Sequence, residues 1–232
     1  MSSVRPCDGC VRSGSVSWEP DDVSSRYALA GPVYDLLSLE RLVYRRPRAR
    51  LMEMLGPLPG ATVVDVGCGT GLNFAPLRRL VGPAGTIVGV DSSRSMLAAA
   101  RRRVAHGATR AIMVEGDVEQ LPILLPTAGI HAHAIDAVVA TFVVSLLADD
   151  SAFWTTLESL RLRRGCRVAL AELGPPDDAR GPVRPLLRMM TALGGGDPTL
   201  RPWEELTELA RDTVHETLLG GHVHLAVGTW PG

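Results

Sequence analysis

Residues 63 to 71 read Val63-Val64-Asp65-Val66-Gly67-Cys68-Gly69-Thr70-Gly71. The apolar first half is typical of a buried strand, and the glycines that follow mark a tight turn into a helix. Glycine is favoured in such a turn because it adopts dihedral angles closed to other residues and lets a ligand approach the backbone. The free N–H groups at the start of the helix favour a carboxylate or phosphate of that ligand. The stretch therefore predicts a strand–turn–helix unit of a nucleotide-type site.

The spacing of the glycines distinguishes between classes of ligand. The dinucleotide fingerprint is G-x-G-x-x-G. Counted from Gly67, its third glycine falls on Leu72, and counted from Gly69 it falls on Phe74. The pattern present is instead D-x-G-x-G-x-G, beginning at Asp65. A nicotinamide oxidoreductase is therefore disfavoured.

The flanking sequence alternates short apolar runs with helical periodicity. The expected strands are Ala61–Val66, Thr86–Val90, Ala111–Glu115, Ile135–Thr141 and Arg167–Glu172. The expected helices are Asn73–Leu80, Arg94–Val104, Asp150–Leu162, Arg184–Leu193 and Pro202–Arg211, with one more from Pro47 to about Gly56. Strands that are apolar on both faces and separated by helices indicate a parallel sheet covered on both sides.

The sequence pattern changes near the C-terminus. Val214–Leu219 and His222–Val227 flank Gly220-Gly221, which is a hairpin signal. The expected fold class is α/β, a doubly wound, Rossmann-like, seven-stranded sheet that is mostly parallel, with one antiparallel strand from the C-terminal hairpin.

Two acidic residues follow the next two strands. Asp91 ends the second strand and Asp117 lies just beyond the third. Ligands in such sheets bind beyond the carboxyl ends of the strands, where a carboxylate accepts the hydroxyls of a ribose. We expect Asp91 to bind a ribose and Asp117 to accept an adenine amino group, although ordinary helix N-caps use the same residue type.

The composition of the chain argues against several classes of binding partner. The net charge of -1 over 232 residues lacks the basic excess of a nucleic-acid binder. No apolar run approaches the ~20 residues of a membrane span, and no secretory signal is visible, so we expect a cytoplasmic protein. Cys7 and Cys10 form a lone C-x-x-C without a second pair or a histidine partner, and we expect no metal site.

The same reasoning divides the chain. Residues 1–22 are expected to be a disordered tail and residues 23–232 a single domain. Within that domain, residues 23–56 form N-terminal helices and residues 180–211 an insert on the substrate side. Oligomeric state is left open between monomer and homodimer.

These motifs together resemble the class I methyltransferases that use S-adenosylmethionine and release S-adenosylhomocysteine. The resemblance is strong from Tyr27 to Glu172 and weak elsewhere. It places the methionine part of the cofactor on the glycine loop, the ribose on Asp91, and the sulfonium near the end of the fourth strand. The cofactor contacts it implies are Asp65, Gly67, Cys68, Gly69, Gly71, Asn73, Asp91, Ser92, Met96, Asp117, Val118, Thr141 and Phe142. One departure is Arg164-Gly165-Cys166, where the family usually has Pro-Gly-Gly.

Within the class, Tyr27–Asp35 resembles the first helix of quinone-biosynthesis C-methyltransferases and of bacterial phosphatidylethanolamine N-methyltransferases. In those enzymes a tyrosine lies over the cofactor. By that resemblance Tyr34 and, more weakly, Tyr27 are cofactor contacts, with helix packing as the alternative.

No catalytic dyad is evident, and the class needs none for an amine acceptor, because the cofactor supplies the activated methyl group. Tyr34 and Glu172 are weak catalytic candidates, and Glu172 either lines the acceptor pocket or pairs with an arginine. His131 and His133 precede the fourth strand and are expected at the opposite end of the sheet, whereas His222 is expected on the cofactor side but displaced laterally.

The predicted function is methyl transfer to a small-molecule or lipid-like acceptor, with N, O and C atoms all open. The alternative is a homologue that binds S-adenosylmethionine without methylating, acting in another reaction or as a binding module.

Overall fold

The computed structural model describes residues 44–104, 108–147, 149, 151–174 and 200–232. The expected tail 1–22, the segment with Tyr27 and Tyr34, and the helix Arg184–Leu193 lie outside the described residues. The strands are β1 (Thr62–Val66), β2 (Thr86–Asp91), β3 (Arg110–Glu115), β4 (Ala137–Thr141), β5 (Arg167–Leu173), β6 (Arg211–Leu218) and β7 (Val223–Thr229). The α-helices are α4 (Arg45–Leu55), α5 (Phe74–Val81), α6 (Arg94–Val104), α7 (Leu121–Thr127), α8 (Ser151–Ser159) and α10 (Pro202–Leu209). Short 3-10 turns are η1 (Val118–Gln120), η2 (Ala132–Ala134), η3 (Val144–Leu146) and η4 (Leu219–Gly221).

The strands form one seven-stranded sheet in the order β3-β2-β1-β4-β5-β7-β6. Strands β1 to β5 are parallel, and β7 runs antiparallel to both β5 and β6. The expected fold class is thus confirmed, including its single antiparallel strand. The strand order reverses between β1 and β4, which is where doubly wound sheets open a crevice for ligands.

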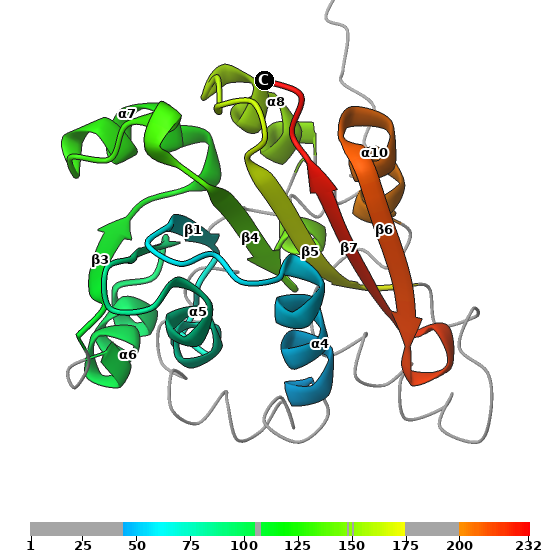
Figure 1. The fold of residues 1–232 in the computed structure, drawn as a ribbon, viewed down its shortest axis with the longest axis horizontal. Coiled ribbons are helices and arrows are strands. Elements are labelled where there is room, and N and C mark those ends of the chain that lie inside the picture. The colour runs from blue at the N-terminus through cyan, green and yellow to red at the C-terminus, as the bar shows by residue number, and fades with distance from the viewer. Residues whose placement is uncertain (1–43, 105–107, 148, 150, 175–199) are drawn as a thin grey trace, which may run out of the picture.

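Helices cover both faces of the sheet (Figure 1). Apolar side chains of α4, α5 and α6 pack on one face and those of α7, α8 and α10 on the other, giving two core layers. Strands buried on both sides explain why the sequence shows apolar runs instead of strict alternation. None of the helices within the described ranges is long and apolar enough to cross a bilayer.

Several predicted boundaries were wrong by a few residues. Helix α4 begins at Arg45, so Pro47 lies in its first turn, where a missing N–H costs no helical hydrogen bond. Strand β6 begins at Arg211 because a bulge between Arg211 and Val214 extends its pairing with β7. The irregular connection before β4 contains the short helix α7, which opens with Pro122 in its first turn.

Candidate functional site

The glycine loop follows β1 and turns into α5. Gly67, Gly69 and Gly71 have φ values of 61°, 53° and 79°, the left-handed region that favours glycine. A Cβ on Gly67 would lie 2.2 Å from Val143 Cγ2, and one on Gly71 would lie 2.7 Å from the ring of Phe74. A Cβ on Gly69 would meet no atom within 4 Å. The outer glycines are therefore required by packing, whereas the middle one faces open space.

Asp91 lies directly beside this loop. Its Oδ2 accepts a hydrogen bond from the backbone N–H of Gly69 at 2.8 Å, and its Oδ1 accepts one from Ser93 N–H at 2.9 Å. Burial raises the pKa of the carboxyl above its ordinary value. Each carboxylate oxygen has more than one lone pair, so both can accept further hydrogen bonds. The structure thus brings together two of the predicted site residues from adjacent strands.

The predicted adenine residues follow β2 and β3 at the same edge of the sheet. Gly116 N–H donates to the carbonyl of Asp91 at 3.1 Å, which joins the ends of the two strands. Asp117 is exposed, and its backbone N–H donates to Gln120 Oε1 at 3.1 Å. Val118 and Met96 are buried, and Ser92 is exposed. Asp117 is therefore the residue that caps the N-terminus of η1, and it is exposed to solvent.

A buried polar network joins α4 to the glycine loop and to β4. Asn73 Nδ2 donates to Asp65 Oδ1 at 2.8 Å and to Thr141 Oγ1 at 3.0 Å. Arg48 Nη1 donates to Asn73 Oδ1 at 3.0 Å and also to Thr141 Oγ1. Asp65, Asn73 and Thr141 were predicted site residues, and the structure brings them into contact. Arg48 was missed, because nothing in a helical run of arginines marks one as facing inward.

Asp65 is the charged centre of this network. Its side chain has no exposed surface, and no described residue donates a hydrogen bond to its Oδ2. Burial raises its pKa from 3.8 to about 7, although the hydrogen bond from Asn73 and the charge of Arg48 act in the opposite direction. The carboxyl therefore changes charge near neutral pH. Cys68, on the same loop, is buried, and the pKa of its thiol is raised mainly by burial.

Three rings adjoin the network on the β7 side. The Tyr44 and Phe142 ring centroids are 4.8 Å apart, and Tyr44 Oη lies 3.4 Å from His222 Nε2. The Arg48 guanidinium lies 5.0 Å from the Phe142 ring centroid. We call Tyr44, Phe142 and His222 the ring cluster. Phe142 was predicted, but Tyr44 was missed. His222 precedes β7, two strands away from β4, and Tyr44 links it to the network.

Among the described residues, Glu172 does not pair with an arginine, which was one of its two predicted roles; a place in the acceptor pocket stays a prediction. Its Oε1 accepts the backbone N–H groups of Val143 and Val144 at 2.9 and 2.8 Å, and its Oε2 accepts the Ser145 hydroxyl at 2.9 Å. The carboxyl is buried, which raises its pKa despite these hydrogen bonds. Glu172 therefore braces the loop after β4 and does not use an arginine for this purpose. That loop holds Phe142 at a φ of 57°, a strained conformation for a bulky residue.

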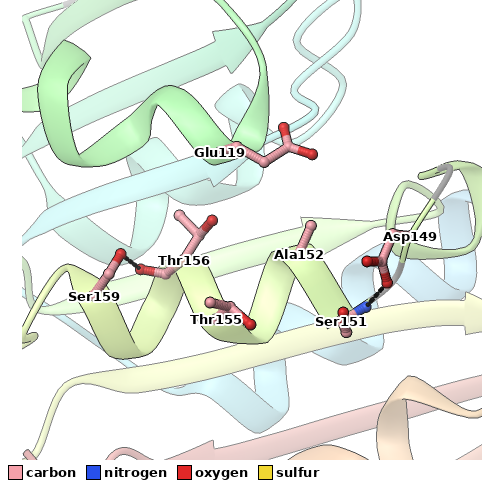
Figure 2. A pocket seen from close by; sticks show the side chains of 7 residues that line it. All are labelled: Glu119, Asp149, Ser151, Ala152, Thr155, Thr156 and Ser159. Atoms are coloured by element: carbon pink, nitrogen blue, oxygen red, sulfur yellow. Dashed lines mark hydrogen bonds between the residues drawn. The ribbon is translucent and has the colours of Figure 1, made fainter.

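A separate hollow of about 350 Å³ lies between η1 and α8. Figure 2 shows Glu119 facing the helix, with Asp149 bonded to the backbone of Ser151 at its start. The lining is polar, with hydroxyl groups from Thr155, Thr156 and Ser159 among others. None of the predicted cofactor residues lines this hollow. Among the described residues, no three histidine, cysteine or acidic side chains gather as a metal site would require.

The family profile described as "Methyltransferase domain" matches residues 63–161, from β1 through α8. The matched segment contains the glycine loop, Asp91, Asp117 and Thr141. The matched segment is thus a methyltransferase domain, of the class I type that uses S-adenosylmethionine. The family therefore matches the resemblance drawn from the sequence.

The curated relatives of this chain differ in the reactions that their names state. Nocamycin O-methyltransferase of Saccharothrix syringae is 32% identical over 163 residues, covering 67% of this chain and 54% of the relative. Demethylmenaquinone methyltransferase of Lactococcus lactis is 36% identical over 76 residues, covering 32% and 30%. Carboxy-S-adenosyl-L-methionine synthase of Methylococcus capsulatus is 32% identical over 105 residues, covering 43% and 43%. The chain thus spans about half the length, or less, of these curated relatives.

Solved structures share the fold of this chain at low identity. Magnesium protoporphyrin IX methyltransferase from Synechocystis, solved with bound S-adenosylhomocysteine, superposes with a TM-score of 0.62 at 18% identity, covering 90% of this chain and 98% of that chain. A methyltransferase from Aquifex aeolicus gives a TM-score of 0.59 at 16% identity, covering 89% and 98%.

Proposed function

We propose that this chain transfers a methyl group from S-adenosylmethionine to a small-molecule acceptor. The observation that carries the proposal is the hydrogen bond from Gly69 N–H to the Asp91 carboxylate, beside open space over Gly69. It brings a backbone loop and a hydroxyl-accepting carboxylate to one point of the family's matched segment. Relatives named as methyltransferases of nocamycin and demethylmenaquinone support a small acceptor.

The residues present fit S-adenosylmethionine on chemical grounds. Asp91 has lone pairs for ribose hydroxyls, and Val118 and Met96 supply apolar surface at the adenine end. At the other end, Arg48 offers a positive charge for a carboxylate, and Asp65 Oδ2 offers a vacant acceptor for an ammonium group. Opposite charges at this end match the two charged groups of an amino acid.

The cofactor supplies a methyl group activated on a sulfonium sulfur. The protein has to bind and orient the cofactor and exclude water from the reacting atoms. The glycine loop and Asp91 bind the cofactor. Thr141, held by Asn73 and Arg48, orients the end of β4. The rings of Tyr44 and Phe142 exclude water beside it, because Tyr44 is buried and Phe142 half-buried.

The proposal specifies the cofactor more narrowly than the acceptor. A lipid-like acceptor remains a prediction, since most of the 180–211 segment lies outside the described residues and its helix α10 packs on the sheet. The contacts of Tyr34 and Tyr27, the cytoplasmic location and the choice between monomer and homodimer also remain predictions.

One observation favours the alternative of a homologue that modifies the cofactor instead of an acceptor, namely the similarity to a carboxy-S-adenosyl-L-methionine synthase. The products separate the two reactions. Methyl transfer accumulates S-adenosylhomocysteine, whereas carboxylation of the cofactor consumes S-adenosylmethionine and forms none.

Calorimetric titration of S-adenosylmethionine tests the site. Asp91→Asn should weaken binding by about 10- to 150-fold, the range expected for hydrogen bonds to a charged group. The matched control is Asp212→Asn, an exposed residue of β6, which should leave affinity unchanged. Equal affinities of the wild type and the Asp91 variant would refute the assignment, and NAD should not bind either protein.

A further inference from the structure

The sheet topology divides its carboxyl edge into two halves. Strands β1, β2 and β3 carry the glycine loop, Asp91 and Asp117, which we assign to the cofactor. On the other side of the switch point lie the ends of β4 and β5 and the beginning of β7, which runs the opposite way. An acceptor has to approach the methyl group from the side opposite the sulfur. Beyond the cofactor contacts expected at the end of β4, the β5–β7 side is the part of this edge left for an acceptor.

The ring cluster occupies that half. His222 directly precedes β7, and its carbonyl accepts the N–H of Gly174, which follows β5, at 2.8 Å. Phe142 directly follows β4, and the Glu172 brace holds the residues after it. Tyr44 comes from the beginning of α4 and contacts both rings. Three segments thus place two aromatic rings and an imidazole beside the end of β4.

His222 differs from His224, the buried histidine of β7. His224 has a partner on each ring nitrogen, since Nδ1 lies 3.0 Å from His215 Nε2 and Nε2 lies 3.1 Å from the Gly221 carbonyl. His222 has no exposed surface, and its Nδ1 has no hydrogen-bond partner in the described part of the chain. An unsatisfied buried nitrogen costs stability, and Nδ1 is therefore the ring nitrogen of His222 with an unused hydrogen-bonding position.

Burial also lowers the pKa of His222. The imidazole is therefore neutral at physiological pH and has one nitrogen lone pair to offer. In the tautomer that carries its proton on Nε2 and donates it to Tyr44 Oη, this lone pair lies on Nδ1.

We propose that the acceptor is a planar phenolic or enolic hydroxyl compound and that His222 Nδ1 takes its hydroxyl proton. The inference rests on the proposed methyl transfer and specifies its acceptor. The flat rings of Tyr44 and Phe142 suit a planar molecule. As the hydroxyl oxygen bonds to the methyl carbon, the carbon–sulfur bond breaks and its electron pair stays on sulfur. The hydroxyl proton passes to Nδ1, and the imidazolium later releases it to water.

Two phenols that differ in acidity test this role. In mildly alkaline buffer para-nitrophenol is already ionised and needs no base, whereas para-cresol keeps its proton. His222→Gln should lower kcat for para-cresol by about 100-fold or more and that for para-nitrophenol by less than about fivefold. His131→Gln, at an exposed histidine before β4, is the matched control and should change neither rate.

Two further measurements guard against loss of structure. Affinity for S-adenosylhomocysteine, by calorimetry, should be unchanged in His222→Gln, and para-cresol should bind the resulting complex about tenfold more weakly than it binds the wild-type complex. Tyr44→Phe keeps the ring but removes the Nε2 partner, and should slow para-cresol more than para-nitrophenol. This variant decides the question if His222→Gln does not fold.

Equal losses with both phenols, or no loss with either, would overturn the proton-accepting role. An affinity of His222→Gln for para-cresol equal to that of the wild type would also overturn the proton-accepting role. A wild-type protein that binds S-adenosylmethionine but methylates neither phenol would overturn the acceptor class alone. Absence of S-adenosylmethionine binding would instead overturn the proposed function.

Discussion

Replacing Asp65 with asparagine should stabilise the protein at alkaline pH. The side chain is fully buried, with one hydrogen bond from Asn73 and no described partner on Oδ2. Asparagine has nearly the same shape and keeps an oxygen for the Asn73 donor. The substitution therefore removes the buried negative charge with little change in packing.

The magnitude follows from the pKa of Asp65, which burial raises from 3.8 to about 7 in the folded chain. A difference of this size corresponds to about 4 kcal/mol between the protonation states. Because the folded chain holds the proton more tightly than the unfolded chain, folding stability falls as pH rises between about 4 and 7. The wild type loses this stability across that window, and Asp65→Asn does not.

Thermal unfolding without cofactor is the assay. At about pH 8 the melting temperature of Asp65→Asn should exceed that of the wild type by about 10 °C, and near pH 4 the two should converge. Asp136→Asn is the control, because Asp136 accepts hydrogen bonds from Thr62 and Arg163 and should lose stability on substitution. A difference in melting temperature between Asp65→Asn and the wild type that stays the same across the pH range would refute the reasoning.

Substitutions at four further positions test the loop and its supports. Gly71→Ala should cost more than about 2 kcal/mol, because it combines a positive φ with a clash against the Phe74 ring, whereas Gly69→Ala should cost about 1 kcal/mol yet abolish cofactor binding. Unfolding and calorimetry separate the two effects. Glu172→Met should cost about 2 kcal/mol and reduce methyl transfer, because the backbone N–H groups of Val143 and Val144 would lose their acceptor; unchanged melting would contradict this. Arg48→Met should weaken S-adenosylmethionine binding about tenfold and raise the pKa of Asp65 further, since Arg48 lowers it; Arg48→Lys should retain part of the affinity.

Local patterns in the sequence predicted most of the fold. Asp65–Gly71 shows the turn from strand to helix, and the apolar runs separated by helical segments predicted the parallel sheet that the structure shows. The predicted ends of helices and strands were wrong where a sequence rule for ending an element has an exception. Pro47 is tolerated in the first turn of α4, and the bulge in β6 depends on its partner strand.

The candidate site was predicted unevenly. Asp65, Asn73 and Asp91 were identified because they keep a fixed distance from the glycine loop along the chain. Arg48 and Tyr44 were missed, since their partners lie far away in sequence. Tyr44 meets a histidine 178 residues further on. Glu172 was noticed for its place at a strand end, but its bonding to the loop after β4 depends on how two neighbouring strands end.

The sequence by itself determined the glycine loop, the order of strands and helices and the class of cofactor, because each depends on residues that are neighbours along the chain. Only the tertiary structure decided that Arg48, Asn73 and Thr141 share a network, that Glu172 is a brace, and that Tyr44, Phe142 and His222 meet. The physical reason is that such contacts arise when separate strands and helices are packed at one edge of the sheet. Burial, which sets the charge of Asp65 and leaves His222 Nδ1 without a described partner, does not exist before that packing.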